Sequence, residues 1–315
     1  MSNKLVSNVK IKDISPSLPG EAGKLLPKVL KPVRCSFELN GVNLALARGI
    51  TRVIQSELLV KVLTFDDGDY ETNDDFMLRD FVKNRVMCIP IKQAENLGEV
   101  FTLSVINNTH APMYVKTAKI QRARGNAGLP CNETADVAFI APNKYLTIKK
   151  MYVIEGYGYN FGGMTLTSGA LNVPLDVEPI NLYTGKGVSS SVSNPQKHKI
   201  QFDTNGTIEP KKVVAMACKE IIRRLEGIRE LMYTMRKSGE THKLTIKGEN
   251  STTGNIVMRM VCDMYPDVDA ITYNVDAIDR VLDISIKSDD PNEILQGAIK
   301  SAIIILKDIG NAIGQ

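Results

Sequence analysis

The chain has 315 residues and is 43% hydrophobic, which is enough for two domains or for one composite domain that carries an insertion. Its 39 Lys and Arg residues face 35 Asp and Glu residues, and this weak basic excess argues against a protein that binds nucleic acid through its whole surface. Five widely spaced cysteines and only three histidines indicate neither a zinc site nor a disulfide framework.

The N-terminal segment has no apolar signal core, and no run approaches the roughly 18 apolar residues that a membrane span needs. We therefore expect a protein that is not secreted, does not enter a membrane and works in a reducing compartment. Residues 14 to 33 hold four prolines and two glycines, too many for a helix or a central strand, and predict an irregular lead-in.

A strand is expected at residues 33 to 39, because this partly alternating run ends at the Asn40-Gly41 turn. A helix with two distinct faces is expected next, from Asn43 to Leu58. Its apolar face should pack inward and consists of Leu44, Ala47, Ile54 and Leu58. Its polar face stays available for contacts and consists of Arg48, Arg52 and Gln55.

A β-rich run at residues 59 to 65 is followed by an acidic stretch from 66 to 75. This stretch lacks the glycine and glutamate positions of a calcium-binding loop, so we expect a solvated loop. A second amphipathic segment, residues 76 to 87, follows, and Pro90 closes that element.

Between residues 98 and 190 the pattern changes to short β-like runs separated by clusters of Gly, Pro and Asn. This change predicts an inserted β-rich domain. After it, a strand at residues 199 to 203 leads into a long helix with Pro210 at its first position. The apolar seam of this helix consists of Val214, Ala217, Ile221, Leu225, Ile228 and Met232.

The last 75 or so residues repeat this order. A strand at 242 to 247, a polar loop at 249 to 253 and a helix at 254 to 264 precede two β-like runs at 268 to 275 and 280 to 287. The closing helix begins with Asp290 as N-cap, Pro291 in the first turn and Glu293 at the third position. Its apolar stripe consists of Leu295, Ala298, Ala302, Ile305, Leu306 and Ile309.

Both halves thus run strand, turn, amphipathic helix, two strands and long helix, with the insert late in the first half. Neither half can bury its long-helix seam alone, so the seams are expected to pack against each other within one molecule. The predicted fold is α+β: an intramolecular pseudo-dimer of two βαββα-type halves with an inserted β-rich domain. The expected segments are a first dimerisation part (1–97), the insert (98–190), a return strand with the long helix (191–237) and the second half (238–315).

Two segments of the first half resemble the alpha-like subunits of multisubunit RNA polymerases. VRCSFELNGVNLALARGITRVIQSEL resembles the opening of the archaeal D-type subunit, of the third subunit of Pol II and of bacterial alpha. RDFVKNRVMCIPI is similar to the acidic-Phe-aliphatic-x-His-Arg-x-x-x-Ile-Pro-Leu stretch of that family. The matching positions in the second segment are Asp80, Phe81, Arg85, Ile89 and Pro90.

The C-terminal half is similar to the archaeal L-type subunit and to the eleventh subunit of Pol II. Its segment GENSTTGNIVMRMV keeps Glu249, Thr252, Gly254 and Asn255 of the loop that opens a helix in that family. The segment from Asp290 to Leu295 is likewise similar to the start of that family's last helix. The likeness spans residues 33 to 310 in the correct order.

The resemblance implies a fold like the N-terminal domain of bacterial alpha and a non-catalytic assembly platform for transcription, without cofactor, metal or small-molecule substrate. It implies that the two largest polymerase subunits dock on this chain, that small accessory subunits bind nearby and that DNA is met only through the complex. The implied interface residues are Asn43, Arg48, Arg52, Asp80, Phe81, Arg85, Pro90, Glu249, Gly254, Asn255 and Arg259.

The sequence departs from the family pattern at several positions. Thr51-Arg52 stands where Arg-Arg is usual, Asn84 replaces a His, and Val275-Asp276-Ala277 stands in place of a His-Pro pair. The contacts that the family makes through these side chains are therefore not assigned to this chain. Fusion of the two subunits in this order resembles the polymerases of large cytoplasmic DNA viruses, which implies a cytoplasmic viral factory or a virion as the location.

Other interpretations remain open for several of these residues. Arg48 and Arg52 suit solvated helix charges, and Gly254 with Asn255 suits an ordinary turn and cap. The tyrosines of residues 156 to 169, with Lys149 and Lys150, suit a stand-alone nucleic-acid-binding module. An enzyme with an unrecognised site is the other alternative, although no catalytic triad, phosphate loop or paired-carboxylate motif is recognised in the sequence.

Overall fold

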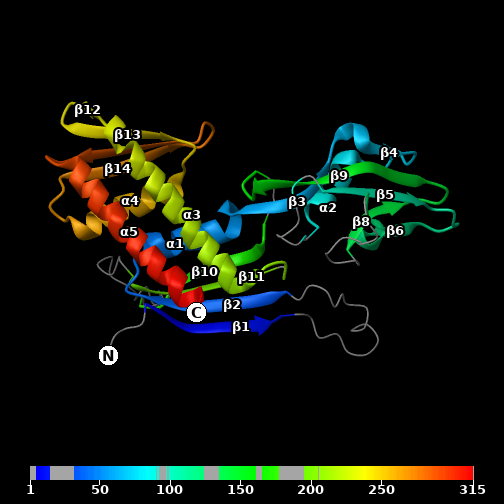
Figure 1. The fold of residues 1–315 in the computed structure, drawn as a ribbon, viewed down its shortest axis with the longest axis horizontal. Helices are drawn as coiled ribbons and strands as arrows, with labels where there is room; N and C mark the ends of the chain where they lie inside the picture. The colour runs from blue at the N-terminus through cyan, green and yellow to red at the C-terminus, as the bar shows by residue number, and fades with distance from the viewer. Residues whose placement is uncertain are drawn as a thin grey trace, which may run out of the picture.

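The computed structural model describes residues 5–14, 32–89, 91, 97, 99–123, 135–160, 165–176, 195–204 and 206–314. It is a mixture of helices and antiparallel sheets, so the α+β class is confirmed. Figure 1 shows two bodies, a larger one that carries the long helices and a smaller one made mainly of strands. No helix in these ranges is long and apolar enough to cross a lipid bilayer.

The larger body contains two antiparallel four-stranded sheets with corresponding strand orders, β1-β2-β11-β10 and β12-β13-β15-β14. Alternate residues point into the core, as Cys35, Phe37 and Leu39 do in the first sheet and Leu244 and Ile246 do in the second. The first sheet is built from β1 (Val6–Asp13), β2 (Val33–Asn40), β10 (Thr167–Pro174) and β11 (Lys197–Thr204). The second is built from β12 (Arg236–Ser238), β13 (Thr241–Lys247), β14 (Ala270–Asp276) and β15 (Val281–Lys287).

Four helices lie between the two sheets (Figure 1): α1 (Leu44–Arg52), α3 (Pro210–Leu231), α4 (Ser251–Met264) and α5 (Pro291–Gly314). The long helices α3 and α5 pack along each other. All the residues expected on their apolar seams are buried except Ile305, which is half-buried. The buried ones are Val214, Ala217, Ile221, Leu225, Ile228 and Met232 on or just after α3, and Leu295, Ala298, Ala302, Leu306 and Ile309 on α5.

In the larger body, the helix ends differ from the expected ones at the end of α1 and at the start of α4. The first helix is an α-helix only to Arg52, and the chain continues as a π-type turn, η2 (Val53–Glu57). The loop expected at 249 to 253 is shorter, because the side chain of Asn250 accepts a hydrogen bond from the amide of Thr252 at 2.8 Å and so caps α4 from Ser251 onwards. Pro210 is the first residue of α3, as expected.

The smaller body has its own hydrophobic core and contains a five-stranded sheet, β3-β9-β5-β7 with β4 beside β9, and the pair β6-β8. Its helix α2 (Arg79–Met87) contacts β3 and β8. The strands are β3 (Leu59–Phe65), β4 (Tyr70–Thr72), β5 (Val100–Ile106), β6 (Met113–Lys116), β7 (Gln121–Arg122), β8 (Asp136–Ile140) and β9 (Tyr145–Tyr157). Short 3-10 turns occur at η3 (Asp67–Asp69), η4 (Thr117–Lys119) and, in the larger body, η5 (Met232–Thr234).

The strand pair β3–β9 joins the two bodies. Val60 and Val62 belong to the core of the larger body, whereas Leu63 and Phe65, further along the same strand, belong to the core of the smaller one. Helix α2 shares this second core, and β10 pairs with β11 in the larger body. The expected domain boundaries stay predictions.

The second amphipathic helix begins at Arg79 rather than near Phe76. Asp74 is buried, and its side chain accepts hydrogen bonds from the amides of Phe76 (3.2 Å) and Ala141 (3.2 Å), which holds this stretch as a turn. Phe76 itself is 96% exposed. Most of the expected lead-in, and Pro90, lie outside the described residues.

Candidate subunit interface

Helices α1 and α4 lie side by side in opposite directions. At the start of α1, the Asn43 side chain accepts from the amide of Leu46 (2.9 Å) and donates to Asp263 near the end of α4 (2.9 Å). At the end of α1, Arg52 donates to the hydroxyl of Ser251, the first residue of α4 (3.2 Å). Asn43 is therefore both a helix cap and a link between the two halves of the chain.

A glycine allows these two helices to approach closely. A Cβ atom on Gly49 would lie 2.7 Å from Cδ1 of Ile256 and 3.6 Å from Cγ2 of Thr252. Carbon atoms pack no closer than about 3.5 Å without repulsion. Any larger residue at position 49 thus requires the Ile256 side chain to move.

Two polar stripes run along this helix pair. On α1, Arg48 and Arg52 are four residues apart and both exposed. On α4, Asn255 and Arg259 are four residues apart and half-buried, and they lie between Ser251 and Asp263, which contact α1. The stripes are therefore neighbours. We call the surface formed by Arg48, Arg52, Asn255 and Arg259 the α1–α4 face.

The carboxylates near the α1–α4 face are already engaged within the chain. Asp263 forms an ion pair with Arg259 at 3.0 Å, and Glu249 accepts a hydrogen bond from the hydroxyl of Thr253 at 2.6 Å. Arg48 and Arg52 form no ion pair with any described residue. Guanidinium groups suit protein interfaces because their planar fork donates several hydrogen bonds at once.

A buried polar network fastens the first half to the second beneath this face. Glu57, which is 4% exposed, forms an ion pair with Arg224 of α3, which is 5% exposed. The same carboxylate accepts hydrogen bonds from the hydroxyl of Thr252 (2.8 Å) and the side-chain amide of Asn250 (3.0 Å) at the start of α4. Glu57 thus ties together the end of α1, the long helix and α4.

Arg224 is held from a second side by Glu220, one turn earlier on α3, at 2.8 Å. Burial alone would raise the pKa of the Glu220 carboxyl, but hydrogen bonds from Arg223 and Arg224 outweigh it and leave that pKa below its usual value. Burial opposes the charge on Arg224, yet the attraction of Glu57 and Glu220 keeps its pKa above the usual value. Glu220 and Arg224 therefore both stay charged at neutral pH.

Gly254 does not act as the turn residue that its sequence context indicated. It lies inside α4, buried, and a Cβ atom there would be 2.7 Å from Cδ1 of Leu282 and 2.8 Å from Cδ2 of Tyr273. Glycine is therefore needed for close packing of α4 on β14 and β15. The cap is Asn250, so the expectation that Asn255 caps the helix is also wrong.

Three other expected interface residues lie on α2 in the smaller body and do not join the α1–α4 face (Figure 1). Asp80, Phe81 and Arg85 are exposed on α2, and the guanidinium of Arg85 lies 4.7 Å from the centre of the Phe81 ring. Phe81 is 55% exposed. The structure thus divides the expected residues into two groups on different bodies.

The residues of the nucleic-acid alternative have partners within the chain. Lys149 pairs with Glu71, and Lys150 lies over the ring of Tyr152. The rings of Tyr157 and Tyr159 are stacked, 5.0 Å apart. In the acidic stretch, as elsewhere in the described ranges, no three metal-ligating side chains lie close enough together to hold an ion.

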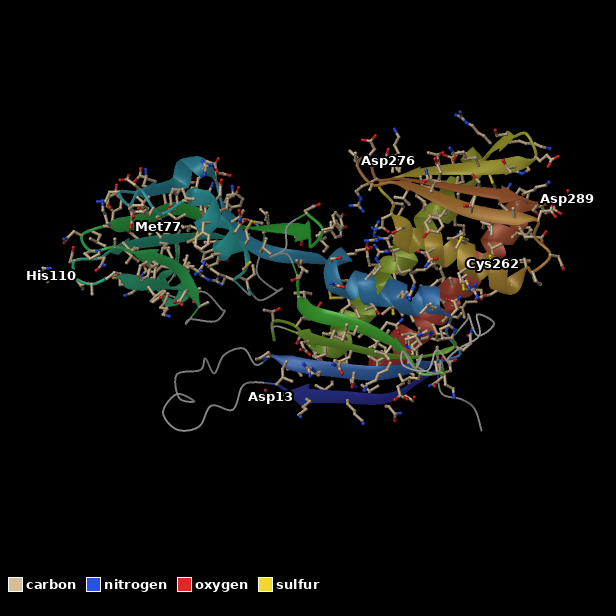
Figure 2. The ribbon with its side chains drawn as sticks, turned by 180° about the vertical axis from the view of Figure 1, so that it is seen from behind. Asp13, Met77, His110, Cys262, Asp276 and Asp289 are labelled. Atoms are coloured by element: carbon tan, nitrogen blue, oxygen red, sulfur yellow. The ribbon has the colours of Figure 1, made fainter. Side chains whose placement is uncertain are left out.

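Figure 2 shows the described side chains of both bodies from the side opposite to that of Figure 1.

The sequence did contain a signal for the buried network. Arg224 follows Ile221 by three residues and precedes Ile228 by four, so it lies on the apolar seam of α3, where a charge needs a partner. The signal did not identify Glu57, because the pairing depends on how the halves fold together.

No family model matches the chain. It is 28% identical to the DNA-directed RNA polymerase RPB3-11 homolog of African swine fever virus from a Malawi tick isolate, with 86% of each chain covered. The proteins of the same name from a Kenyan pig isolate and a Namibian warthog isolate are 28% and 27% identical, with the same coverage. This similarity confirms the resemblance that the two sets of motifs indicated.

Proposed function

Since the chain is related over most of its length to the RPB3-11 homologs of African swine fever virus, we propose that it is a viral subunit of a DNA-directed RNA polymerase. In this proposal it is a non-catalytic assembly platform, on which the two largest subunits dock. The metal-dependent chemistry lies in those partners, and DNA meets this chain only through the complex. Such a subunit works in a cytoplasmic viral factory or in the virion.

The platform is a pseudo-dimer within one polypeptide. Its support is the correspondence between the halves: the sheets have the orders β1-β2-β11-β10 and β12-β13-β15-β14, α1 packs on α4, and α3 packs on α5. Each of these helices contacts the corresponding helix of the other half, as expected for an interface with twofold symmetry. Residues 1–97 and 191–237 form the part that resembles the archaeal D-type subunit, 238–315 the part that resembles the L-type subunit, and 98–190 the insert.

The main support for the docking proposal is the geometry of the α1–α4 face. The face joins both halves, it is held rigidly from beneath by the Glu57 network, and it presents two arginines that form no ion pair with a residue that the structure describes. When a partner binds a rigid surface, few side chains and backbone segments lose conformational freedom, so little free energy is spent on ordering them. The exposed group on α2, Asp80, Phe81 and Arg85, forms a second docking surface for a large or accessory subunit.

Affinity purification from infected cells followed by mass spectrometry tests this proposal. The wild-type chain should bring down the two largest polymerase subunits. A variant with Arg48→Glu and Arg52→Glu should lose most of both, because it replaces two cations of the α1–α4 face with anions. The matched control is Lys300→Glu with Lys307→Glu, which makes the same charge change on the exposed side of α5.

If the doubly reversed arginine variant is folded and still recovers both large subunits in wild-type yield, docking does not use the α1–α4 face. If the wild-type chain recovers neither subunit, the platform role itself is wrong. Salt-sensitive binding of the isolated chain to DNA or RNA would instead support the nucleic-acid-binding alternative.

A further inference from the structure

The second sheet of the larger body has an edge that is only partly covered. β12 pairs with the first residues of β13, with Arg236 opposite Lys243 and Ser238 opposite Thr241. β13 continues to Lys247, and no strand in the described part of the chain pairs with residues 244 to 247 on that side. The backbone amides and carbonyls of an uncovered edge are free to pair with another strand.

A groove of about 860 Å³ lies beside this open edge. It is formed where the chain leaves α3 and passes through η5 before β12 reaches β13. The groove therefore offers room for an added segment next to residues 244 to 247 of β13, which no described strand pairs with on the β12 side. Its lining residues are Leu231, Thr234, Arg236, Lys237, Ser238, Lys243, Thr245 and Lys247.

The charged side chains of this groove are all cationic. Lys243 forms an ion pair with Asp283 of β15 at 2.9 Å. Arg236, Lys237 and Lys247 are exposed and have no ion-pair partner among the described residues. Three cations without a partner around a free strand edge favour an anionic occupant.

We propose that the free edge of β13 binds an extended acidic segment of a partner protein, which adds to the sheet as a further strand beside β12. Its backbone pairs with residues 244 to 247, and its carboxylates lie near Arg236, Lys237 and Lys247. This is β-strand addition, in which backbone hydrogen bonds supply affinity and side chains supply selectivity. The site is separate from the α1–α4 face and does not depend on the proposed polymerase role.

An acidic polypeptide explains the groove better than a nucleic-acid strand does. The backbone of a free strand edge alternates donors and acceptors at the spacing of another polypeptide backbone, whereas a sugar–phosphate chain offers no matching donors. Lysines beside an edge also prevent two copies of the same chain from pairing there. The same charges that repel a second copy attract an acidic strand.

Fluorescence anisotropy with the full chain tests the proposal. The probe is a labelled octapeptide that alternates glutamate and valine. It should bind the wild-type chain, more weakly at high salt because exposed charges are screened. A variant with Arg236→Glu and Lys247→Glu should bind the peptide about tenfold more weakly, since two attractions become repulsions. The control, Lys300→Glu with Lys307→Glu, should leave peptide binding unchanged.

A second peptide with the same side chains, but methylated on every backbone nitrogen so that neither of its edges can pair, separates strand addition from simple charge attraction. Wild-type protein should bind it at least about tenfold more weakly, because methylated amides cannot pair with an edge. This comparison needs no variant and is independent of variant folding. Equal affinity for both peptides, no binding of either, or equally tight binding of a 12-nucleotide oligothymidylate would each overturn the proposal.

Discussion

The guanidinium of Arg280, at the tip of the β14–β15 hairpin, lies 4.1 Å from the centre of the Tyr159 ring, just beyond the end of β9. Tyr159 in turn stacks on Tyr157, the last residue of β9. Because β9 pairs with β3 and enters the smaller body, this contact fastens the strands that join the two bodies to the second half of the chain. It helps to fix how the bodies are placed relative to each other.

Tyr159→Ala or Arg280→Ala should therefore loosen the smaller body without unfolding either core. The loss of one exposed cation–π contact costs about 0.5–1 kcal/mol. The exposed thiols Cys88 and Cys262, one in each body, permit spin labels without new cysteines once Cys131 is replaced by serine. Both variants should broaden the distance distribution between the labels. Lys150→Ala, which removes a cation–π contact within β9, should not.

Removal of Arg224 should destabilise the chain strongly. Arg224→Leu leaves the buried Glu57 carboxylate without its cation, which costs about 3–5 kcal/mol. Urea unfolding measures this loss. The neighbouring Arg223→Leu removes a largely exposed guanidinium from its pair with Glu220, which keeps Arg224 as a partner, and should cost less than about 1 kcal/mol. Equal losses in the two variants would show that the Glu57 network does not stabilise the junction.

The glycines of two helices should respond in opposite ways to alanine. Gly254→Ala places a methyl group against Leu282 and Tyr273, and such overpacking costs about 1–3 kcal/mol, more than the roughly 1 kcal/mol of helix propensity gained. Gly227→Ala on α3 meets no atom within 4 Å and should stabilise by up to about 1 kcal/mol. Thermal unfolding midpoints of the two variants distinguish these effects.

The cysteines should differ sharply in reactivity. Burial raises the pKa of the Cys35 thiol to about 11 and that of Cys218, on α3, to about 12, so neither forms a thiolate at neutral pH. Cys88 and Cys262 are exposed. Iodoacetamide followed by peptide mass spectrometry should find early modification at Cys88 and Cys262 only, among these four. Rapid labelling of Cys218 in the folded protein would mean that α3 and α5 separate readily.

Stability should fall in acid, and Glu220 should contribute to the fall. Its pKa in the folded chain is below the usual 4.5, so the unfolded chain binds the proton first as the pH drops. The stabilisation is complete well above pH 4.5 and is lost as the pH falls through the folded-state pKa. Glu220→Gln should make the urea-unfolding free energy less steep with pH between pH 4.5 and the lower pKa of Glu220 in the folded chain. An unchanged slope would contradict the assignment.

Local patterns in the sequence were sufficient to predict the buried faces of α3 and α5. Their apolar residues recur every three or four positions over many turns. This periodicity can be recognised without knowing which helix packs against the apolar face. The residues from Val214 to Ile228 and from Leu295 to Leu306 that the pattern selected are buried, apart from the half-buried Ile305. The same reasoning placed Pro210 at the start of α3.

Strand partners were not predictable in this way. The residues of β3 do not indicate that it pairs with β9, and those of β10 do not indicate that it pairs with β11. A strand's composition says that it is half-buried, not which distant strand it joins. The role of Gly254 was missed for a related reason, because Leu282 and Tyr273 reach it only in the folded chain.

The short passage from α3 through η5 into β12 means that the two halves are always present in equal number. Their association is unimolecular, so it does not weaken when the protein is diluted. The few residues that link the halves set the effective concentration of one half near the other. Neither half can accumulate in surplus over the other. The covalent link thus secures the stoichiometry and the pairing of the two halves.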